Sequence, residues 1–170
     1  MTWLVIILVV LVVVGIFLGT ALFGAPYVPS REKEVREAFE HLRPLTKKDC
    51  VVDFGCGDGV VMRAAARAGA GKAVGLELNP ILVGVAWWRC RGKKGISVRC
   101  CNMNRCKLPE EMTVVYVFGL DRVMKMIKPR LERFARERGR AVWVVSNAFE
   151  FEGMTALKRW GSFYVFEILP

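Results

Sequence analysis

The stretch Val51-Val-Asp-Phe-Gly-Cys-Gly-Asp-Gly59 decides the fold class of this 170-residue chain. A short apolar segment, 50–54, leads into glycines at 55, 57 and 59, and a helical pattern begins directly after the last of them. Glycines at these positions allow a tight turn and a close approach of the backbone to a ligand, because a side chain would occupy that space. The pattern predicts the first strand–loop–helix unit of an α/β sheet with a ligand site at the turn.

Two acidic residues narrow the chemistry of the ligand. A dinucleotide site would require glycine at position 60, where this chain has Val60, and the carboxylate of Asp53 would repel a pyrophosphate. Asp53 suits a cationic ligand with an amino group, such as S-adenosylmethionine. Glu77 ends a second apolar segment, where a carboxylate can accept both ribose hydroxyls of a nucleoside. Together the two features favour a nucleoside site over a turn that serves packing alone.

The rest of the chain alternates between apolar segments and helical patterns. We expect strands at 50–54, 72–78, 96–101, 113–118, 140–146 and 162–168, and helices at 31–43, 60–68, 80–91 and 121–138. Strands separated by helices of this length predict βαβ units with parallel pairing. The expected fold class is therefore α/β, a Rossmann-like, doubly wound and mostly parallel sheet.

The first 30 residues carry no charged side chain, although the chain has 26 Lys and Arg and 16 Asp and Glu. Trp3–Phe23 is a run of apolar or small residues, and as a helix it would span about 31 Å, the hydrocarbon thickness of a bilayer. A cleaved signal peptide is the alternative, but no basic residue precedes the run and the run exceeds the length of a signal core. We expect a transmembrane anchor at 1–24, a linker with an amphipathic helix at 25–49, and the main domain at 50–170.

The residues that flank the apolar run predict its orientation. Arg31, Lys33, Arg36 and Arg43 follow the run, so the positive-inside rule places the N-terminus outside and the main domain in the cytoplasm, or in the matrix of a mitochondrion. The six cysteines are expected to be thiols in such a compartment. Adjacent Cys100 and Cys101 without a CxxC pair are poorly spaced for zinc, and we expect no metal site.

The net charge of +10 favours polyanionic partners, either anionic lipid headgroups or nucleic acid. The apolar run favours the lipid bilayer, with nucleic acid as the weaker alternative. The predicted helix at 121–138 is rich in Arg and Lys and suits either partner, or else it is a solvated helix face. No recognisable RNA-binding module accompanies it.

Several stretches together resemble one protein family. Asp53–Gly59 with Glu77 looks like the first motif of the class I, seven-strand S-adenosylmethionine-dependent methyltransferases. The wider set resembles the membrane-anchored ATP synthase c-subunit lysine N-methyltransferase family and its prokaryotic relatives; it comprises the apolar run, PYVPS at 26–30, VVDFGCGDG at 51–59, GLELNP at 75–80, VVYVFGL at 114–120 and VVSNAF at 144–149. The resemblance implies S-adenosyl-L-methionine as the cofactor and a lysine of a membrane protein as the methyl acceptor.

The resemblance also implies which residues form the cofactor site. Asp53 and the glycines of the turn would shape the methionine end, Glu77 would hold the ribose, and Asn102 would reach the adenine amine. Tyr27 and Ser30 match a linker motif that folds over the cofactor. In full, the residues implied in cofactor binding are Tyr27, Ser30, Asp53, Gly55, Cys56, Gly57, Asp58, Gly59, Glu77, Asn79 and Asn102.

The methyl acceptor is expected at the carboxyl end of the fourth strand. Phe118 is the predicted wall of the acceptor site, and Tyr116 and Phe149 are further aromatic candidates, although Tyr116 suits the core as well. The chain departs from the family pattern in two places: Thr113 replaces an Asp, and Gly119 with Asp121 replaces a Leu-Leu-Pro-like ending. An RNA or small-molecule (lipid or quinone) methyltransferase, and a catalytically silent membrane-anchored binding module, therefore stay as alternatives.

Overall fold

The computed structural model describes residues 2–23, 30–119 and 121–170; within the first range it leaves the side chains of residues 13 and 16–23 undescribed. The helices are α1 (Thr2–Phe23), α2 (Glu32–Leu42), α3 (Val60–Arg67), α4 (Pro80–Cys90) and α5 (Asp121–Arg138). The strands are β1 (Cys50–Phe54), β2 (Lys72–Glu77), β3 (Ile96–Cys100), β4 (Val114–Val117), β5 (Val142–Asn147), β6 (Lys158–Trp160) and β7 (Phe163–Ile168).

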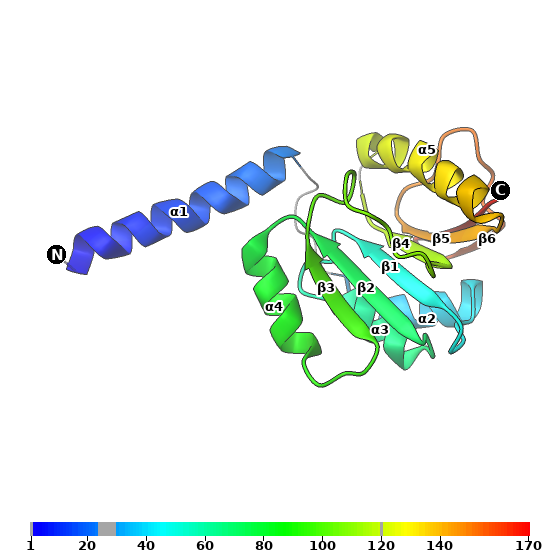
Figure 1. Cartoon of the computed structure of the whole chain (residues 1–170), viewed down its shortest axis with the longest axis horizontal. Helices are drawn as coiled ribbons and strands as arrows, with labels where there is room; N and C mark the ends of the chain where they lie inside the picture. Colours follow the sequence, from blue (N-terminus) through cyan, green and yellow to red (C-terminus); the bar gives the residue numbers. More distant parts are fainter. Residues whose placement is uncertain (1, 24–29, 120) are drawn as a thin grey trace.

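The strands form one seven-stranded sheet in the order β3-β2-β1-β4-β5-β7-β6 (Figure 1). The five strands from β3 to β5 run parallel, and β7 pairs antiparallel with both β5 and β6. The chain moves outward from β1 to β3 and then returns to β4 on the other side of β1. This reversal creates a switch point at the carboxyl ends of β1 and β4, where open α/β sheets bind ligands.

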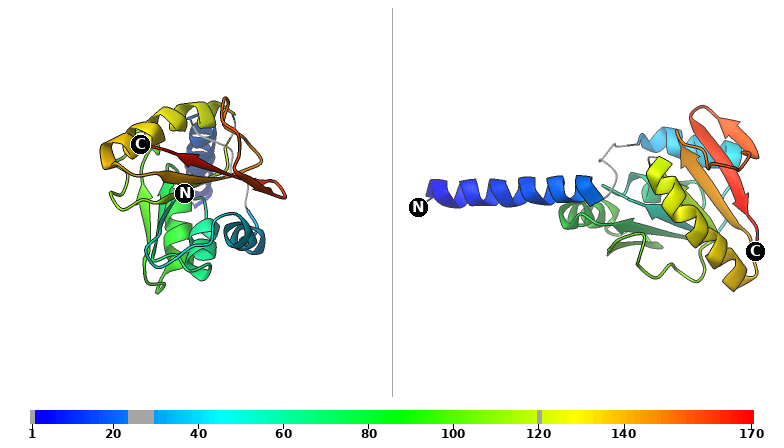
Figure 2. Two further views of the ribbon diagram at one scale, coloured as in Figure 1. Left: turned by 90° about the vertical axis from the view of Figure 1, so that its right-hand side faces the viewer. Right: turned by 90° about the horizontal axis from the view of Figure 1, so that it is seen from above.

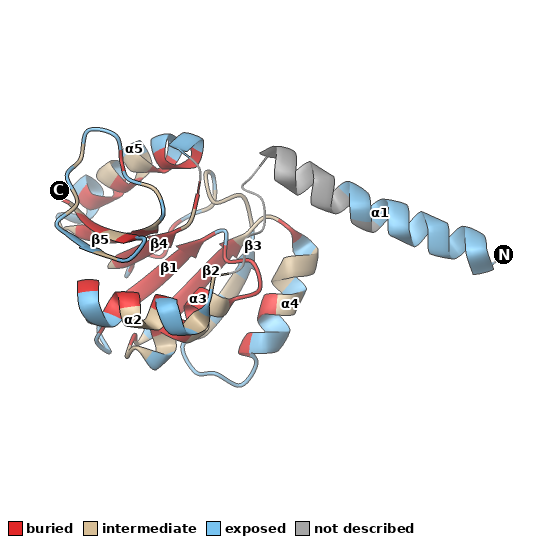
Figure 3. Cartoon of the chain, turned by 180° about the vertical axis from the view of Figure 1, so that it is seen from behind, coloured by how far each residue is buried: buried red, intermediate tan, exposed pale blue. Residues whose placement is uncertain are grey.

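Helices cover both faces of the sheet (Figure 2). The helices α2, α3 and α4 bury residues such as Phe39 and Met62 against one face, whereas α5 buries Ile127 and Leu131 against the other. Figure 3 shows that the buried residues concentrate in the strands between these layers. Strands buried on both faces have continuous apolar sequences, which is why the central strands β1, β4 and β5 were predictable.

The predicted fold class is confirmed for the sheet, and each predicted strand and helix from residue 31 onward agrees with the structure to within two residues at either end. The three-residue strand β6 was not predicted. Its sequence, Lys158-Arg159-Trp160, contains two charges and is too short to show an apolar pattern. β6 and β7 form a terminal hairpin, so the sheet is mixed at this edge.

The helix α1 exposes its described apolar side chains from Trp3 to Val12. Among the residues that the structure describes, no helix combines the length and the apolar character that a membrane crossing requires. This finding contradicts the prediction of a single-pass membrane protein with its N-terminus outside and its main domain in the cytoplasm or matrix.

Candidate functional site

The glycine turn connects β1 to α3 at the switch point. Gly55, Gly57 and Gly59 have φ angles of +83°, +51° and +81°, a region of backbone conformation that other residues rarely adopt. A Cβ atom on Gly55 would meet no atom within 4 Å, whereas one on Gly59 would lie 3.0 Å from Cys90 Sγ and from Met62 Cε. The turn is therefore open at its first glycine and tightly packed where the helix begins.

Glu77 links the glycine turn to the next strand–helix unit. Its carboxylate accepts hydrogen bonds from the N–H of Gly57 at 2.9 Å and from the N–H of Asn79 at 2.8 Å. The Asn79 side chain in turn caps α4, since its Oδ1 accepts from the N–H groups of Ile81 and Leu82. Glu77 is thus held at the carboxyl end of β2, in the position that the sequence predicts for a ribose ligand.

Asp53 is the least satisfied acidic residue of this region. It lies in β1 with 2% of its surface exposed, and its Oδ2 has no hydrogen-bond partner among the described residues. Burial raises the pKa of its carboxyl well above the ordinary value, and the nearby charges of Glu77 and Asp58 raise it further. A buried, unpartnered carboxylate is costly unless a cation or a donor approaches it. Asp53 and Glu77 together therefore fit a ligand with an ammonium group and ribose hydroxyls.

Two further residues of the predicted cofactor site have structural partners. Asp58 Oδ1 accepts from the N–H of Val60 at the start of α3 at 3.2 Å, and its Oδ2 pairs with Arg89. The side chain of Cys56 is buried in the core, where it packs over Gly75. The side chains of Cys56, Asp58 and Asn79 thus all have contacts within the protein. Their contacts with a cofactor stay predictions.

Two predicted segments border the same edge of the sheet. Asn102 follows β3, and the N–H of its neighbour Cys101 donates to the carbonyl of Glu77 at 2.8 Å. Ser30 Oγ lies 3.4 Å from the hydroxyl of Tyr116, a residue that pairs in register with Asp53. The structure thus brings the end of the linker beside the buried carboxylate, whereas Tyr27 lies outside the described residues.

The predicted acceptor wall contains two aromatic rings. Phe118 follows β4 and Phe149 follows β5, and their ring centroids are 6.3 Å apart. Ser146 Oγ donates to the carbonyl of Phe149 at 2.5 Å, and Ala148 between them has a φ of +66°. Tyr116 is 1% exposed, so the interpretation of this tyrosine as a core residue is confirmed. The Phe118–Phe149 pair is therefore the aromatic surface beside the switch point.

Sequence reasoning missed several features that shape this region. The left-handed backbone at Ala148 carried no signal, because alanine seldom adopts it. Gly75 did carry a signal, since glycine inside a strand indicates a close approach of another group.

Thr113 lies at the amino end of β4, away from the glycine turn, where its Oγ1 donates to Asp49 and accepts from the N–H of Cys50. The departure at Thr113 therefore concerns the start of β4 and not the acceptor wall.

The described residues contain no group of three or more His, Cys, Asp or Glu side chains arranged to hold a metal ion. All six cysteines are free thiols, and Cys50, Cys56 and Cys90 are buried.

Known proteins are similar to this chain in sequence and in fold. Residues 53–158 match the family described as the ANTKMT methyltransferase domain. A protein-lysine N-methyltransferase of Saccharolobus islandicus (strain REY15A) is 37% identical over 133 residues, which cover 75% of this chain and 79% of that protein. The glycine turn, Glu77 and the Phe118–Phe149 pair all lie inside the matched family domain.

Two animal proteins are similar to shorter parts of this chain. The human lysine N-methyltransferase of the ATP synthase c-subunit is 31% identical over 120 residues, 69% of this chain and 50% of that protein. The adenine nucleotide translocase lysine N-methyltransferase of Mus musculus is 43% identical over 61 residues, 36% of this chain and 26% of that protein. The chain thus spans about half of the length of the human relative.

A solved structure shares the fold over most of both chains. An RNA methyltransferase from Salinibacter ruber, in complex with S-adenosyl-L-homocysteine, aligns with a TM-score of 0.74 at 24% identity and covers 84% of this chain and 94% of its own. At this level of identity the likeness concerns the fold.

Proposed function

The chain belongs to the family of ANTKMT methyltransferase domains, and from this membership we propose that it methylates the side-chain amine of lysine in a protein substrate. It is an S-adenosylmethionine-dependent methyltransferase. The lysine acceptor is proposed from its 37% identity to the protein-lysine N-methyltransferase of S. islandicus and from the aromatic pair beside the switch point.

The observation that supports the cofactor site is the pair of carboxylates at the ends of β1 and β2. Asp53 Oδ2, buried without a partner among the described residues, would bind the ammonium group of S-adenosylmethionine. Glu77 would hold the ribose hydroxyls, and the open space at Gly55 would admit the ligand beside the backbone. When bound, S-adenosylmethionine supplies a methyl group that passes in line from a sulfonium sulfur to the acceptor nitrogen, while the sulfur keeps the electron pair.

The chain itself acts mainly by positioning and desolvation. A lysine amine accepts a methyl group only when its nitrogen is neutral, and removal from water favours that form. Phe118 and Phe149 would exclude water from the amine, and their ring faces would attract the methylated cation that results. The proton lost by the amine leaves to solvent, so the proposal requires no general base.

A labelling experiment tests the proposed acceptor. The purified chain is incubated with S-adenosylmethionine labelled on its methyl group and with a cell extract that contains both protein and RNA. Labelled protein is then hydrolysed to amino acids. We expect label in methylated lysine. At a cofactor concentration near the wild-type dissociation constant, the Asp53→Asn variant should label much more slowly. The Glu111→Gln variant, which removes an exposed carboxylate at the amino ends of the strands, should label as the wild type does.

Nucleic acid is a second candidate acceptor, because the net charge is +10 and α5 carries a dense set of basic residues. The same experiment distinguishes the two. Label that survives protease but is released by ribonuclease would replace the protein-lysine proposal with an RNA acceptor.

A further inference from the structure

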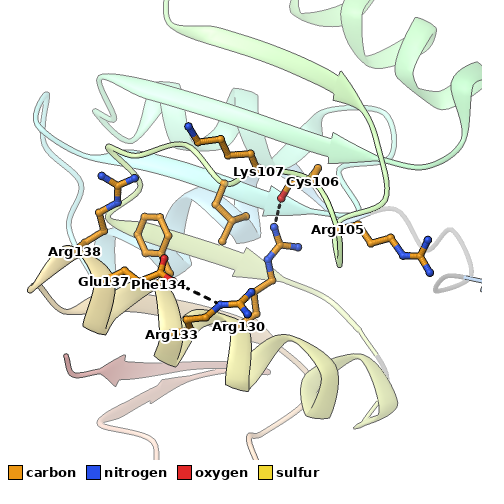
Figure 4. A pocket seen from close by; sticks show the side chains of 9 residues that line it. Arg105, Cys106, Lys107, Arg130, Arg133, Phe134, Glu137 and Arg138 are labelled. Carbon is orange, nitrogen blue, oxygen red and sulfur yellow. Dashed lines mark hydrogen bonds and ion pairs between the residues drawn. The ribbon is translucent and has the colours of Figure 1, made fainter.

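A basic pocket lies between α5 and the segment that follows Asn102 (Figure 4). Its volume is about 310 Å³, and it contains none of the predicted cofactor residues. Leu108 and Phe134, both buried, form an apolar floor. The cations of the basic pocket are Arg105, Lys107, Arg130, Arg133 and Arg138, and Glu137 is the one acidic member among its described lining residues.

One arginine holds the two walls of the basic pocket together. Arg130 projects from α5, and its two terminal nitrogens donate to the backbone carbonyls of Met103 and Cys106 in the facing segment. Both acceptors are neutral backbone carbonyls, and no carboxylate of the described residues forms an ion pair with this guanidinium. The pocket is therefore built around a fixed positive charge.

The other cations have weak or shared partners. Lys107 and Arg138 both pair with Glu110, at 3.1 and 3.3 Å, and Arg133 lies 3.9 Å from Glu137. These pairs are largely exposed, and exposed ion pairs contribute little to stability because water and salt screen them. A more highly charged anion can therefore displace the carboxylates at little cost.

The arrangement of the side chains selects the chemistry of the ligand. Figure 4 shows Arg130 and Arg133 rising from one face of α5, with Lys107 on the facing segment, whereas Arg105 extends away from them. Guanidinium groups donate pairs of parallel N–H bonds that match phosphate oxygens, and lysine adds a mobile point charge. A cavity of this volume is at the small end of ligand sites. We propose that the basic pocket binds an oligophosphate group, two or three linked phosphates, either free or carried by a nucleoside.

Calorimetric titration of the full chain with inorganic triphosphate tests the proposal. Saturating S-adenosylhomocysteine is present so that later nucleotide probes cannot enter the cofactor site. The Lys107→Gln/Arg133→Gln double variant removes two exposed cations of the basic pocket and leaves Arg130 and its backbone bonds intact. We expect its dissociation constant for triphosphate to be at least tenfold higher than that of the wild type.

The control is Lys33→Gln/Lys48→Gln, which removes the same charge from exposed positions on α2 and the turn before β1. Its dissociation constant should stay within twofold of the wild-type value. Absence of triphosphate binding, or an equal loss in both double variants, would overturn the proposal, because the net charge of the surface would then explain any binding.

Further titrations identify the source of the phosphates. Similar affinities for triphosphate, ADP and ATP, all weakened in the pocket variant, assign the site to the phosphate group alone. At least tenfold tighter binding of the nucleotides, again lost in the pocket variant, assigns it to a nucleoside phosphate. An RNA oligonucleotide that binds through Lys107 and Arg133 while triphosphate does not bind would overturn the proposal in favour of a nucleic-acid surface.

Discussion

Asp53 combines a cost to stability with a proposed role in binding the cofactor. Burial, together with the charges of Glu77 and Asp58, raises the pKa of its carboxyl well above its ordinary value near 4. A carboxyl whose pKa is raised by folding holds its proton more tightly in the folded state than in the unfolded state. The free energy of unfolding therefore falls as the pH rises from about 4 through the folded pKa. In the ligand-free protein, the buried carboxyl of Asp53 therefore contributes less to stability at neutral pH than at pH 4.

We predict that Asp53→Asn raises the free energy of unfolding of the ligand-free protein by about 1–2 kcal/mol at pH 7 and weakens S-adenosylmethionine binding by about 10- to 100-fold. The stability gain should shrink toward pH 4, where the wild-type carboxyl is protonated and therefore neutral, as the amide of the variant is. Urea unfolding at both pH values and calorimetry check the two parts. A variant that is less stable than the wild type at pH 7 would show that the carboxylate has a partner in the folded state.

Gly75 sets the packing beneath the glycine turn. A Cβ atom at this position would lie 2.5 Å from Cys56 Sγ and 2.6 Å from Met62 Sδ, distances that force the side chains or the backbone to shift. We predict that Gly75→Ala lowers the free energy of unfolding by about 1–3 kcal/mol, as overpacked cores do. Gly84→Ala is the matched control: it adds the same methyl group to an exposed position of α4 where nothing lies within 4 Å. The free energy of unfolding of the control, measured by thermal unfolding, should equal that of the wild type or exceed it by up to about 1 kcal/mol.

The sequence predicted the backbone conformation of the glycine turn better than it predicted the partners of individual side chains. Glu77 was predictable because it ends a strand at a fixed place in a βαβ unit. The ion pair of Asp58 with Arg89 was not, since the two residues belong to different helix–strand units and meet only in the folded chain. A carboxylate in a glycine-rich turn therefore suggests a ligand contact even where the fold uses it to secure two helices.

At the scale of elements, a buried polar network fixes the amino ends of β1 and β4. Asp49 accepts hydrogen bonds from the N–H and hydroxyl of Thr46 at 2.8 Å, from the hydroxyl of Thr113 at 2.9 Å and from Arg43 at 2.9 Å. Burial opposes ionisation of Asp49, but the hydrogen bonds from Thr46 and Thr113 and the charge of Arg43 outweigh it and lower its pKa. The network therefore stabilises the fold above the ordinary carboxyl pKa, and this contribution is lost as the pH falls through the lowered pKa.

We predict that Thr113→Val lowers the free energy of unfolding by about 1–2 kcal/mol at pH 7, because Asp49 loses a donor and the N–H of Cys50 loses its acceptor. The loss should shrink as the pH falls through the lowered pKa of Asp49, where its carboxyl takes up a proton. S-adenosylmethionine affinity should be unchanged, since Thr113 lies at the edge of the sheet away from the glycine turn. Reduced affinity in calorimetry would contradict this separation of the two edges.

The carboxyl ends of β4 and β5 carry the proposed acceptor wall. We predict that Phe118→Ala raises the KM for the protein substrate at least fivefold and leaves the S-adenosylmethionine dissociation constant within twofold of wild type. Phe118→Leu should fall in between, because it restores apolar surface but not the ring face that attracts the cation. Initial-rate kinetics with each substrate varied in turn provide the measurement. An equal loss of affinity for cofactor would show that Phe118 belongs to the cofactor site instead.

The terminal hairpin shows where prediction of elements from sequence reaches its limit. The apolar alternation of Phe163–Ile168 predicted β7, but three residues of β6 are held by contacts between distant parts of the chain. The ring of Trp160 in β6 stacks on His41 of α2, with centroids 5.1 Å apart. Such a contact depends on the completed fold, so the local sequence around Lys158 does not reveal the strand.

The whole molecule is organised around two cores, one on each face of the sheet. Their described members begin at Val35 and extend to Ile168, and none belongs to α1. The β7 residues, in contrast, contribute to both cores: Phe163 and Val165 lie on the α2 and α3 face, and Phe166 and Ile168 on the α5 face. The carboxyl-terminal hairpin is thus part of the folding unit. No described residue of α1 belongs to either core.

We therefore predict that a variant lacking residues 1–23 keeps the free energy of unfolding of the full chain to within about 0.5 kcal/mol and binds S-adenosylmethionine equally well. Removal of residues 158–170 should abolish cooperative unfolding, because β7 is lost from both cores at once. Urea unfolding followed by circular dichroism measures the first quantity, and calorimetry measures the second. A loss of more than 1 kcal/mol on removal of residues 1–23 would show that the first helix packs against the sheet domain in solution, and would extend the folding unit to the whole chain.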